Sequence, residues 1–387
     1  MKNLFVLYLF LTASLLPSFG QTGDYHLVWQ DNFDQGALDQ TVWTIEVNGD
    51  GGGNQELEYY RAENVTLGID PVSGDSCLIL TAKQENYGGH VCTSGRLNTK
   101  NRMSFKYGKI EARIKLPQTG NGLWPAFWMM GNDFDQVGWP KCGEIDIMEM
   151  GSNSAFSRGT QDKYFSGWFH WGETWNNHPN WGLASTSTYG LQDDFHLWTL
   201  VWDPNAISMY LDLDKYPDNK PYVTMNTYKA NPVPGDAAYY FNKPFFVILN
   251  LAIGGQFTGI TGNGNIGQIT AFAKASDGEP KMYIDYVKVY QKGDAGESYT
   301  GPALKDPTAI KPVASQQFNV SCNAGVLSVE GNATPAKMVL YNPAGNIMME
   351  VKGAGSANVS NLAAGLYILK IQPVSGNEEV YKIMINV

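Results

Sequence analysis

The chain is poor in cysteine, in excess positive charge and in histidine, and each shortage excludes a class of protein. Its 387 residues include four cysteines, Cys77, Cys92, Cys142 and Cys322, and five histidines, with no CxxC pair and no zinc-ligand spacing. The 27 basic residues are outnumbered by 37 acidic ones, and the net charge is −10. A zinc protein and a nucleic-acid-binding protein are therefore disfavoured, and a neutral ligand is expected.

Two of the cysteines flank a predicted hairpin. A disulfide between Cys77 and Cys92 fits this arrangement, and two buried free thiols fit it equally well. The sequence alone leaves both states open.

Long apolar runs are confined to the N-terminus. Residues 1–20, MKNLFVLYLFLTASLLPSFG, combine a basic start, an apolar stretch and small residues at a cleavage position. This pattern predicts a signal peptide, and hence a protein that is secreted or displayed at the cell surface. A membrane anchor is the alternative, but the apolar run is shorter than the ~20 residues that a span needs.

Short strand-like runs separated by Gly, Asn, Asp and Pro fill residues 25 to 291, without a long helical periodicity. They predict an all-β fold, a sandwich that forms a catalytic domain over residues 21–293. A polar, Pro- and Gly-containing linker is expected over 294–316. Residues 317–387 resume short strands and predict a small β-sandwich C-terminal domain, which contains no Trp.

The segment GEIDIMEM, residues 143–150, places Glu144, Asp146 and Glu149 among apolar residues. Buried like charges cost stability, so a function is expected for them. A solvated edge strand is one alternative, but the apolar neighbours require a packed core. A metal site is another, although no further oxygen ligands gather nearby in the sequence.

The phase of the three acids predicts a local irregularity. Alternation in a strand puts Glu144 and Asp146 on one face and Glu149 on the other. A β-bulge at residues 147–148 returns Glu149 to the face of the other two acids. Two glutamates about four strand steps apart have Cα atoms roughly 13 Å apart. Side chains that lean toward each other could bring the carboxyl groups to the ~5.5 Å of a retaining glycosidase, and the sequence leaves a wider gap open. The charge of Asp146 would raise the pKa of a neighbouring glutamate.

These residues resemble a known family. GEIDIMEM resembles the bulged E-x-D-x-x-E signature of glycoside hydrolase family 16. The segments NQELEYY, KYGKIEARIKLP, GLWPAFWMMG, DFHLWTLVWD, FFVILNLAIGG and MYIDYVKVYQ follow the order seen in laminarinase-like members. The resemblance covers about residues 25 to 292.

The resemblance implies a β-jelly-roll with a concave cleft and a retaining endo-hydrolase that needs no cofactor for its chemistry. Glu144 would be the nucleophile, Glu149 the acid/base, and Asp146 would tune both. Asn54, Arg96 and His170 resemble residues of the family's cleft, although a core histidine fits His170 nearly as well.

Aromatic platforms for sugar are sought among the tryptophans nearest the acids. Trp124, Trp128 and Trp139 are the candidates, with core packing as the alternative for each, most of all for Trp128. The resemblance further implies a structural Ca²⁺ on the opposite face, held by Asp285 and a backbone carbonyl near Asn32.

The C-terminal segment contains YNPAGNIMMEV, then NLAAGLYILKI, then YKIMINV. These segments resemble the sorting domain of type IX secretion substrates, which would make the secretion machinery a partner. A carbohydrate-binding module is the alternative, and the lack of Trp speaks against it. The expected substrate is a β-1,3-glucan such as laminarin, or a mixed-linkage β-1,3-1,4-glucan, cut by a monomeric enzyme. A galactan-cleaving relative and a non-catalytic jelly-roll lectin are the competing functions.

Overall fold

The computed structural model describes residues 25–192, 194–304, 318–323, 325–331, 335–342, 347–373 and 379–385. It divides into two units, residues 1–305 and 306–387. The predicted signal peptide lies outside the described residues. Among the described residues, no helix has the length and apolar character needed to cross a bilayer.

The first unit contains an eight-stranded sheet, called here the back sheet. In spatial order its path is β16 (Val223–Asn226), β15 (Ala206–Leu211), β14 (His196–Trp202), β9 (Gly108–Lys115), β18 (Lys281–Gln291), β5 (Ser76–Thr81) and β4 (Val65–Ile69). β1 (His26–Asp31) pairs with β18 outside this path.

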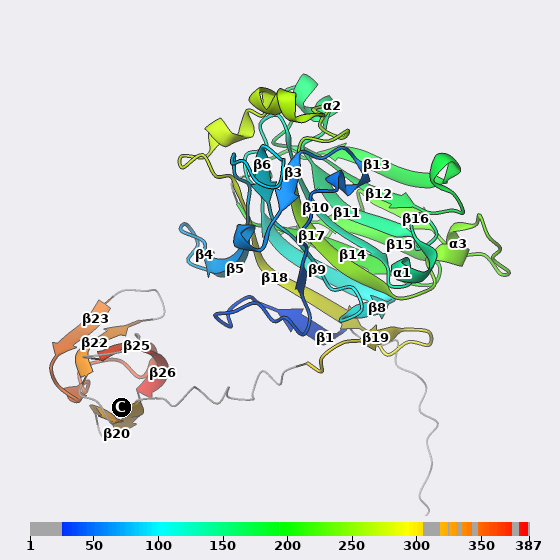
Figure 1. Ribbon diagram of the computed structural model, residues 1–387. Helices are drawn as coiled ribbons and strands as arrows, with labels where there is room; N and C mark the ends of the chain where they lie inside the picture. Colours follow the sequence, from blue (N-terminus) through cyan, green and yellow to red (C-terminus); the bar gives the residue numbers. More distant parts are fainter. Residues whose placement is uncertain are drawn as a thin grey trace, which may run out of the picture. The chain divides into compact units, whose positions relative to one another are not determined.

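A nine-stranded sheet, called here the site sheet, forms the second layer (Figure 1). Its path is β13 (Asn180–Thr186), β12 (Tyr164–His170), β11 (Glu144–Met150), β10 (Leu123–Gly131), β17 (Phe245–Ile253), β7 (Arg96–Asn98) and β2 (Thr44–Ile45). β8 (Ser104–Lys106) pairs with β17 and with β19 (Ser298–Thr300).

The remaining elements of this unit are short. β3 (Glu58–Tyr60) and β6 (Cys92–Ser94) form a parallel pair. The helices are η1 (Gly51–Gly53), η2 (Ala62–Asn64), α1 (Phe134–Val137), α2 (Asn153–Ser157), η3 (Trp175–Asn177), α3 (Ala237–Tyr240), η4 (Asn263–Gln268) and η5 (Ala271–Lys274). The fold is thus almost wholly β, as the sequence predicts.

Alternating side chains explain how the two layers pack. In β9, Ile110, Ala112 and Ile114 are fully buried, while the charged residues between them, Glu111 and Arg113, point away from the core. β17 is buried at every position, which its continuous apolar sequence FFVILNLAI indicates. The main core therefore lies between the sheets, and the other face of the site sheet is free to carry polar side chains.

The predicted start of the linker is wrong. β19 lies within the expected linker, yet it pairs with β8 of the site sheet. The Glu297 carboxylate accepts backbone N–H groups from residues 292–294 and fixes the turn that leads into β19. The polar composition of this segment predicts a linker and does not reveal the hydrogen bonds of Glu297 that order the turn. Residues 305–316, the rest of the predicted linker, lie outside the described residues.

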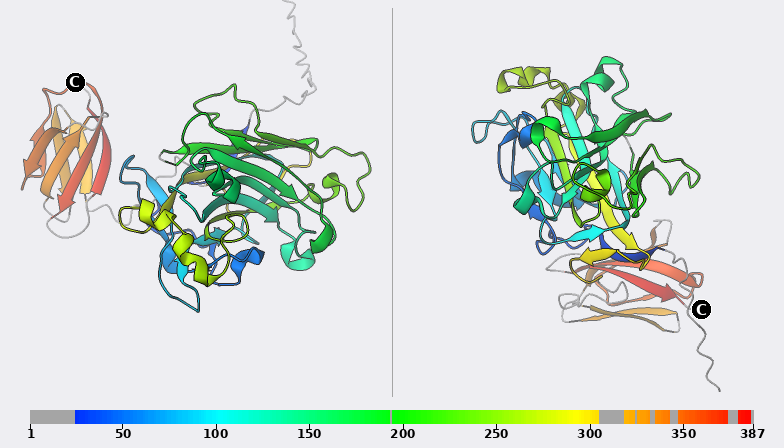
Figure 2. Two further views of the ribbon diagram at one scale, coloured as in Figure 1. Left: turned by 90° about the horizontal axis from the view of Figure 1, so that it is seen from above. Right: turned by 90° about the vertical axis from the view of Figure 1, so that its right-hand side faces the viewer.

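The second unit forms two small sheets (Figure 2). One contains β20 (Phe318–Asn323), β21 (Val326–Gly331) and β24 (Ser356–Asn358), and the other contains β23 (Ile347–Lys352), β22 (Pro335–Tyr341), β25 (Gly365–Pro373) and β26 (Glu379–Ile385). Phe318, Leu327, Met338 and Leu369 are among the buried residues of its own core. The described strands agree with the predicted small β-sandwich.

Candidate active site

A bulge in β11 brings the two glutamates into register with one face of the site sheet. In the pairing with β10, Glu144 lies opposite Met130 and Glu149 lies opposite Ala126, four residues away. Between these two pairs, at residues 147–148, the register of β11 against β10 shifts. The register of β11 against β12 shifts at the same point. Both apolar side chains of the bulge are fully buried. The predicted bulge is confirmed.

Aromatic side chains flank the middle acid on the same face. Asp146 lies between Trp128 of β10 and Trp168 of β12, because residues directly opposite in an antiparallel pair share a face. The Trp168 ring lies over Gly182 of β13, where an added Cβ would come within 2.4 Å of it. The sequence analysis missed Trp168, although alternation in YFSGWFH places it on the face of His170.

Each glutamate receives one indole N–H. Trp139 Nε1 donates to Glu144 Oε2, and Trp124 Nε1 donates to Glu149 Oε1, both at 3.0 Å. Trp124 also stacks on Phe257, with ring centroids 4.7 Å apart. These contacts place two of the predicted tryptophans directly against the acids.

The environment raises the pKa of all three acids unequally. Burial raises the pKa of Glu144 to about 7, although its indole donor and the positive charge of Arg96 lower it. Burial also raises the pKa of Glu149 to about 8, and the charge of Glu144 adds to that rise. Burial and both glutamates hold the pKa of Asp146 well above its usual range. Arg96 therefore favours the ionised form of Glu144, whereas the charge of Glu144 favours the protonated form of Glu149.

His170 lies beside the acids rather than in the core. Its Nε2 is 3.7 Å from Asp146 Oδ2, and its Nδ1 is 3.2 Å from His178 Nε2. Burial, together with the charge of His178, lowers the pKa of His170 to about 4. A neutral imidazole at this position can donate or accept a hydrogen bond without adding charge.

Arg96 reaches the site from β7. Its Nε is 3.0 Å from Glu46 Oε2, and its guanidinium lies 5.0 Å from the centroid of the Trp128 ring. Asn250 of β17 accepts the Trp128 indole N–H at 2.7 Å. These contacts fix the plane of Trp128, whose ring faces the acids while the neighbouring Phe127 fills the core.

Asn54 directly follows the glycine turn η1. Its side-chain amide donates to Gly52 O at 3.3 Å, and its backbone O accepts the N–H of Gln256 at 2.8 Å. Gly51, Gly52 and Gly53 all have positive φ, which explains three glycines in a row. A Cβ on Gly53 would lie 3.2 Å from the ring of Trp175, so this turn contacts the β12–β13 loop.

Several residues of the site came from loops or distant strands and were missed by sequence reasoning. They are Glu46, Trp168, Trp175, His178, Asn250 and Phe257. Trp175 packs on Trp139 with centroids 4.5 Å apart and remains 57% exposed. Only Trp168 carried a usable signal in its strand periodicity. The others meet the acids through tertiary contacts that a single sequence does not display.

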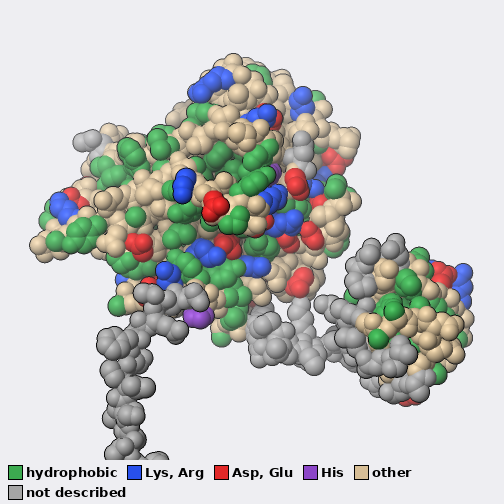
Figure 3. Space-filling model, turned by 180° about the vertical axis from the view of Figure 1, so that it is seen from behind, with side chains coloured by type: hydrophobic (Ala, Val, Ile, Leu, Met, Phe, Trp, Pro, Cys, Tyr) green, Lys and Arg blue, Asp and Glu red, His purple; other side chains and the backbone are tan. Residues whose placement is uncertain are grey.

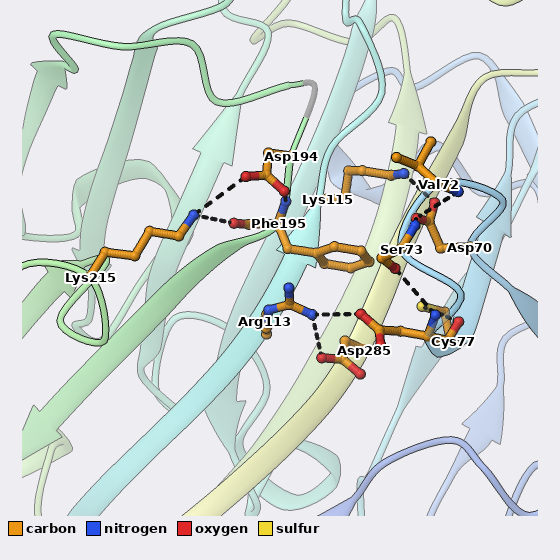
Figure 4. Close-up of polar contacts among 11 residues, drawn as sticks. Asp70, Val72, Ser73, Cys77, Arg113, Lys115, Asp194, Phe195, Lys215 and Asp285 are labelled. Atoms are coloured by element: carbon orange, nitrogen blue, oxygen red, sulfur yellow. Dashed lines mark hydrogen bonds and ion pairs between the residues drawn. The ribbon is translucent and has the colours of Figure 1, made fainter. Parts of the chain in front are cut away.

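The predicted calcium ligand is engaged by a cation. Asp285 Oδ2 lies 2.6 Å from Arg113 Nη1, and the same guanidinium contacts Asp75 at 3.1 Å (Figure 4). Figure 3 shows the molecule from behind, and basic and acidic side chains lie close to one another on that face, as an ion pair between Arg113 and Asp285 requires. Calcium takes six to eight oxygen ligands, so an arginine in this position does not fit the ion. Asn32 follows β1, whose Asp31 lies opposite Val287 of β18. The calcium site stays a prediction.

One group of side chains among the described residues has metal-ligand spacing, and it belongs to the acid site. Ligand atoms of Glu144, Asp146 and His170 lie within 4.8 Å of one another. Two carboxylates and a histidine fall short of a calcium shell. The four cysteines are free thiols, and Cys77 and Cys92 are both fully buried, so the disulfide alternative is not adopted.

With the geometry established, comparison with known proteins identifies the family. The model for "Glycosyl hydrolases family 16" matches residues 53–256. The chain belongs to this family.

Relatives of known sequence agree with that assignment. The chain is 33% identical to the "Beta-glucanase" of Rhodothermus marinus, over 75% of this chain and 94% of the relative. It is 36% identical to the "Clotting factor G alpha subunit" of Tachypleus tridentatus, over 69% of this chain and 34% of that much longer protein. The chain thus spans about a third of the clotting factor.

A solved structure matches the catalytic unit. It is the family 16 protein of a Bacteroides ovatus mixed-linkage-glucan locus, in complex with a G4G4G3G product. The identity is 38%, the TM-score is 0.57, and the match covers 67% of this chain and 99% of that one.

Proposed function

We propose that the chain is a secreted endo-β-glucanase that hydrolyses β-1,3 linkages, in laminarin-type and mixed-linkage glucans, with retention of configuration. The observation that carries the proposal is the bulged strand β11, which places Glu144 and Glu149, both with a raised pKa, on one face. Family membership supports a glycoside hydrolase. The names of the relatives, a beta-glucanase and a mixed-linkage-glucan protein, support the substrate class.

The family resemblance assigns the two roles, and the neighbouring charges agree with it. Glu144, whose ionised form Arg96 favours, attacks the anomeric carbon and forms a glycosyl ester. Glu149, whose protonated form the charge of Glu144 favours, delivers its proton to the departing glycosidic oxygen. In the second half, Glu149 takes a proton from water, the water oxygen attacks the anomeric carbon, and the carboxylate of Glu144 leaves.

Neighbouring groups tune these two steps. The positive charge of Arg96 lowers the pKa of Glu144 and favours its nucleophilic carboxylate form. Arg96 forms its ion pair with Glu46, which leaves the Glu144 carboxylate available for the sugar. The indole of Trp139 orients one carboxylate oxygen of Glu144 and leaves the other for the sugar. Burial and the charges of both glutamates raise the pKa of Asp146 and favour its protonated form, which can donate a hydrogen bond on the same face.

The surroundings of the acids suit a neutral sugar chain. Trp124, Trp128 and Trp168 offer ring faces next to the acids, and pyranose rings carry apolar C–H patches that stack on such faces. Amide and imidazole groups from Asn250 and His170 supply uncharged hydrogen-bonding partners. A sulfated galactan would require basic side chains instead.

Product analysis on a panel of glucans and galactans tests the proposal. We expect oligosaccharides from laminarin and from mixed-linkage glucan, and none from agar or carrageenan. A matched Glu144→Gln variant should bind the glucans without cutting them. Equal binding by both proteins with no cleavage by either would favour the lectin alternative, and cleavage of galactan alone would replace the substrate class.

We also propose that the protein is exported and that the second unit serves as a sorting domain for secretion. The signal-peptide pattern of residues 1–20 and the absence of Trp from the second unit support this proposal. Deletion of residues 318–387 should leave the enzyme active but retained in the periplasm, so that it no longer reaches the medium. Unchanged export of the shortened protein would contradict the sorting role.

A further inference from the structure

A hollow of about 410 Å³ lies at the edge of the sandwich, outside the acid site. Trp181 and Asn180 of β13 and Thr224 and Asn226 of β16 contribute to its wall. The edge strands β13 and β16 and the helix α3 lie along the same side of the unit (Figure 1). None of the described residues that line this hollow is charged.

Trp181 is held with its ring open to solvent. It lies opposite Phe169, so its side chain points toward the core side of the site sheet. β13 is the last strand of the sheet, and the ring therefore projects past the core and remains 47% exposed. Its Nε1 donates to Thr224 O at 3.0 Å, which fixes the plane of the ring. A rigid, half-exposed indole is a ready platform for a sugar ring.

A second hollow of about 380 Å³ is lined in part by residues next in sequence to two that line the first. The two share neighbouring wall positions, because Asn226 and Ala237 line one and Thr227 and Ala238 line the other. Tyr228, 67% exposed, belongs to the second hollow. The adjacent Lys229 is paired with Asp236 at 2.6 Å and presents little free charge.

We propose that the two hollows form a second binding site for a neutral β-glucan chain, with Trp181 and Tyr228 as its aromatic platforms. The inference rests on the proposed glucanase function for the identity of the ligand. Exposed aromatic rings, uncharged amides and a hydroxyl-bearing rim match the alternating apolar and hydroxyl surfaces of a sugar chain. A charged polymer would find no opposite charge among the described lining residues of the first hollow.

The new site is close to the acids. In the register of the site sheet, Glu144 pairs with His170, which pairs with Asn180 at the rim of the first hollow. Two strand spacings of ~4.8 Å put the Cα atoms of Glu144 and Asn180 roughly 10 Å apart. Trp181 lies on the opposite face of the sheet from the acids but on its edge strand, so a glucan long enough to pass around β13 can engage both sites, and the second contact then becomes intramolecular. An oligosaccharide that fills only the acid site gains nothing from it.

The test compares Trp181→Ala with Leu183→Ala in the full chain. Leu183 is a matched control, because it lies on the same strand and face, is 46% exposed and does not line either hollow. Binding is measured by affinity electrophoresis in laminarin, with each change made in a Glu144→Gln background. Hydrolysis of laminarin and of laminaritetraose is measured in the active background.

We expect Trp181→Ala to weaken laminarin binding about tenfold, as loss of one central aromatic anchor commonly does. The KM for laminarin should rise with kcat unchanged, and laminaritetraose hydrolysis should not change. Leu183→Ala should match its parent in every assay. Because Trp181→Ala removes an edge hydrogen bond, Asn226→Arg provides a second variant, which fills the hollow from its exposed rim and should give the same pattern.

Three results would overturn the inference. They are unchanged laminarin binding in both hollow variants, an equal loss in Leu183→Ala, or a change of oligomeric state in light scattering, which would identify the hollow as a contact between two copies. If the active parent cleaves no glucan at all, the proposed function itself fails. Normal laminarin cleavage with no effect of Trp181→Ala leaves that function standing and removes only the second site.

Discussion

Two strands of the catalytic unit carry an acid at a bulge, and the groups that contact the acid differ between the two strands. In β18 the register shifts between Ile284 and Tyr286, and the extra residue Asp285 meets the guanidinium of Arg113 at 2.6 Å. In β11 the shift falls between Asp146 and Glu149, and the donors in contact with the glutamates are neutral indoles. Burial raises the pKa of Asp285, but Arg113 opposes that rise.

The comparison shows which of the two bulges indicates function. A paired acid at a bulge is accounted for by its ion pair and by packing. Asp146 and Glu149 are buried and Glu144 is half-buried, all three have a raised pKa, and no cation among the described residues donates a hydrogen bond to them. Such acids cost stability, so a function is expected for them. Bulges alone do not mark an active site. The raised pKa values of the acids in β11 are what mark this bulge as a candidate active site.

Removing the acids themselves should have the largest effect. Glu144→Ala should lower hydrolysis on the order of 10⁴-fold or more, because the covalent step has no nucleophile. Azide should restore turnover of activated aryl glycosides with inverted products, since the anion attacks from the side of the missing carboxylate.

Glu149→Ala provides the matched contrast. It should keep activity on good leaving groups, which need no proton, and azide should yield products of retained configuration. The configuration of each glycosyl azide is read by proton NMR. The same configuration from both variants would contradict the separate roles assigned to the two glutamates.

Removing the bulge should be the next most harmful change. Deletion of Met148 restores simple alternation and brings the two glutamates four residues apart, so both stay on one face, but loss of the bulge changes the strand pairing and shifts the position of Glu149. Activity should fall about 100-fold or more, as misplacement of a catalytic group by an ångström or so commonly causes. Circular dichroism and laminarin hydrolysis are measured together. Near-normal activity in a folded deletion variant would show that the extra residue is incidental.

The cost of the acids should appear in stability. Burial raises the pKa of Glu149 from 4.5 to about 8, so between these pH values the native state holds a proton that the unfolded chain has released. Stability is therefore full below pH ~4.5 and is lost as pH rises toward ~8. Glu149→Gln removes this loss and should stabilise the protein on the order of 2 kcal/mol at pH 8.

The same substitution should change stability much less at pH 5, where Glu149 is largely protonated in the native state. Urea unfolding at both pH values measures the difference. As a control on the other bulge, Asp285→Asn should be neutral or destabilising at pH 8, because it breaks an ion pair. Equal pH dependence in wild type and Glu149→Gln would contradict the burial of a protonated acid.

Metal removal should have the smallest effect. If Arg113 is the partner of Asp285, treatment with a calcium chelator should leave the melting temperature within about 1 °C, and Arg113→Ala should lower it slightly, since part-exposed ion pairs contribute little. Differential scanning calorimetry with and without added calcium measures both. A chelator-induced fall of several degrees that calcium reverses would favour the calcium site over the ion pair.

Much of the acid strand could be predicted from the sequence, because its information is local. Alternation in GEIDIMEM fixed the phase of the acids and required the bulge, and the structure confirms it. The sequence pattern could not order Glu144 and Glu149, because their pKa difference depends on Arg96, 48 residues upstream of Glu144, and on two indoles from separate segments.

Features that depend on loops were beyond the sequence pattern. Trp175 and His178 reach the site from a loop whose composition resembles any polar turn. Asp285 satisfied a pattern for a metal ligand, but its partner Arg113 is brought to it by pairing of β9 with β18. The linker boundary failed because Glu297 organises a turn through its own side chain, which polar composition does not reveal.

The anomeric configuration of the first product tests the central claim most directly. Wild-type enzyme is mixed with laminarin or mixed-linkage glucan in deuterated buffer, and proton NMR follows the anomeric signals before mutarotation. Two glutamates acting in turn as nucleophile and acid/base predict that the β-anomer is formed first. Initial release of the α-anomer would contradict double displacement, and with it the roles assigned to Glu144 and Glu149.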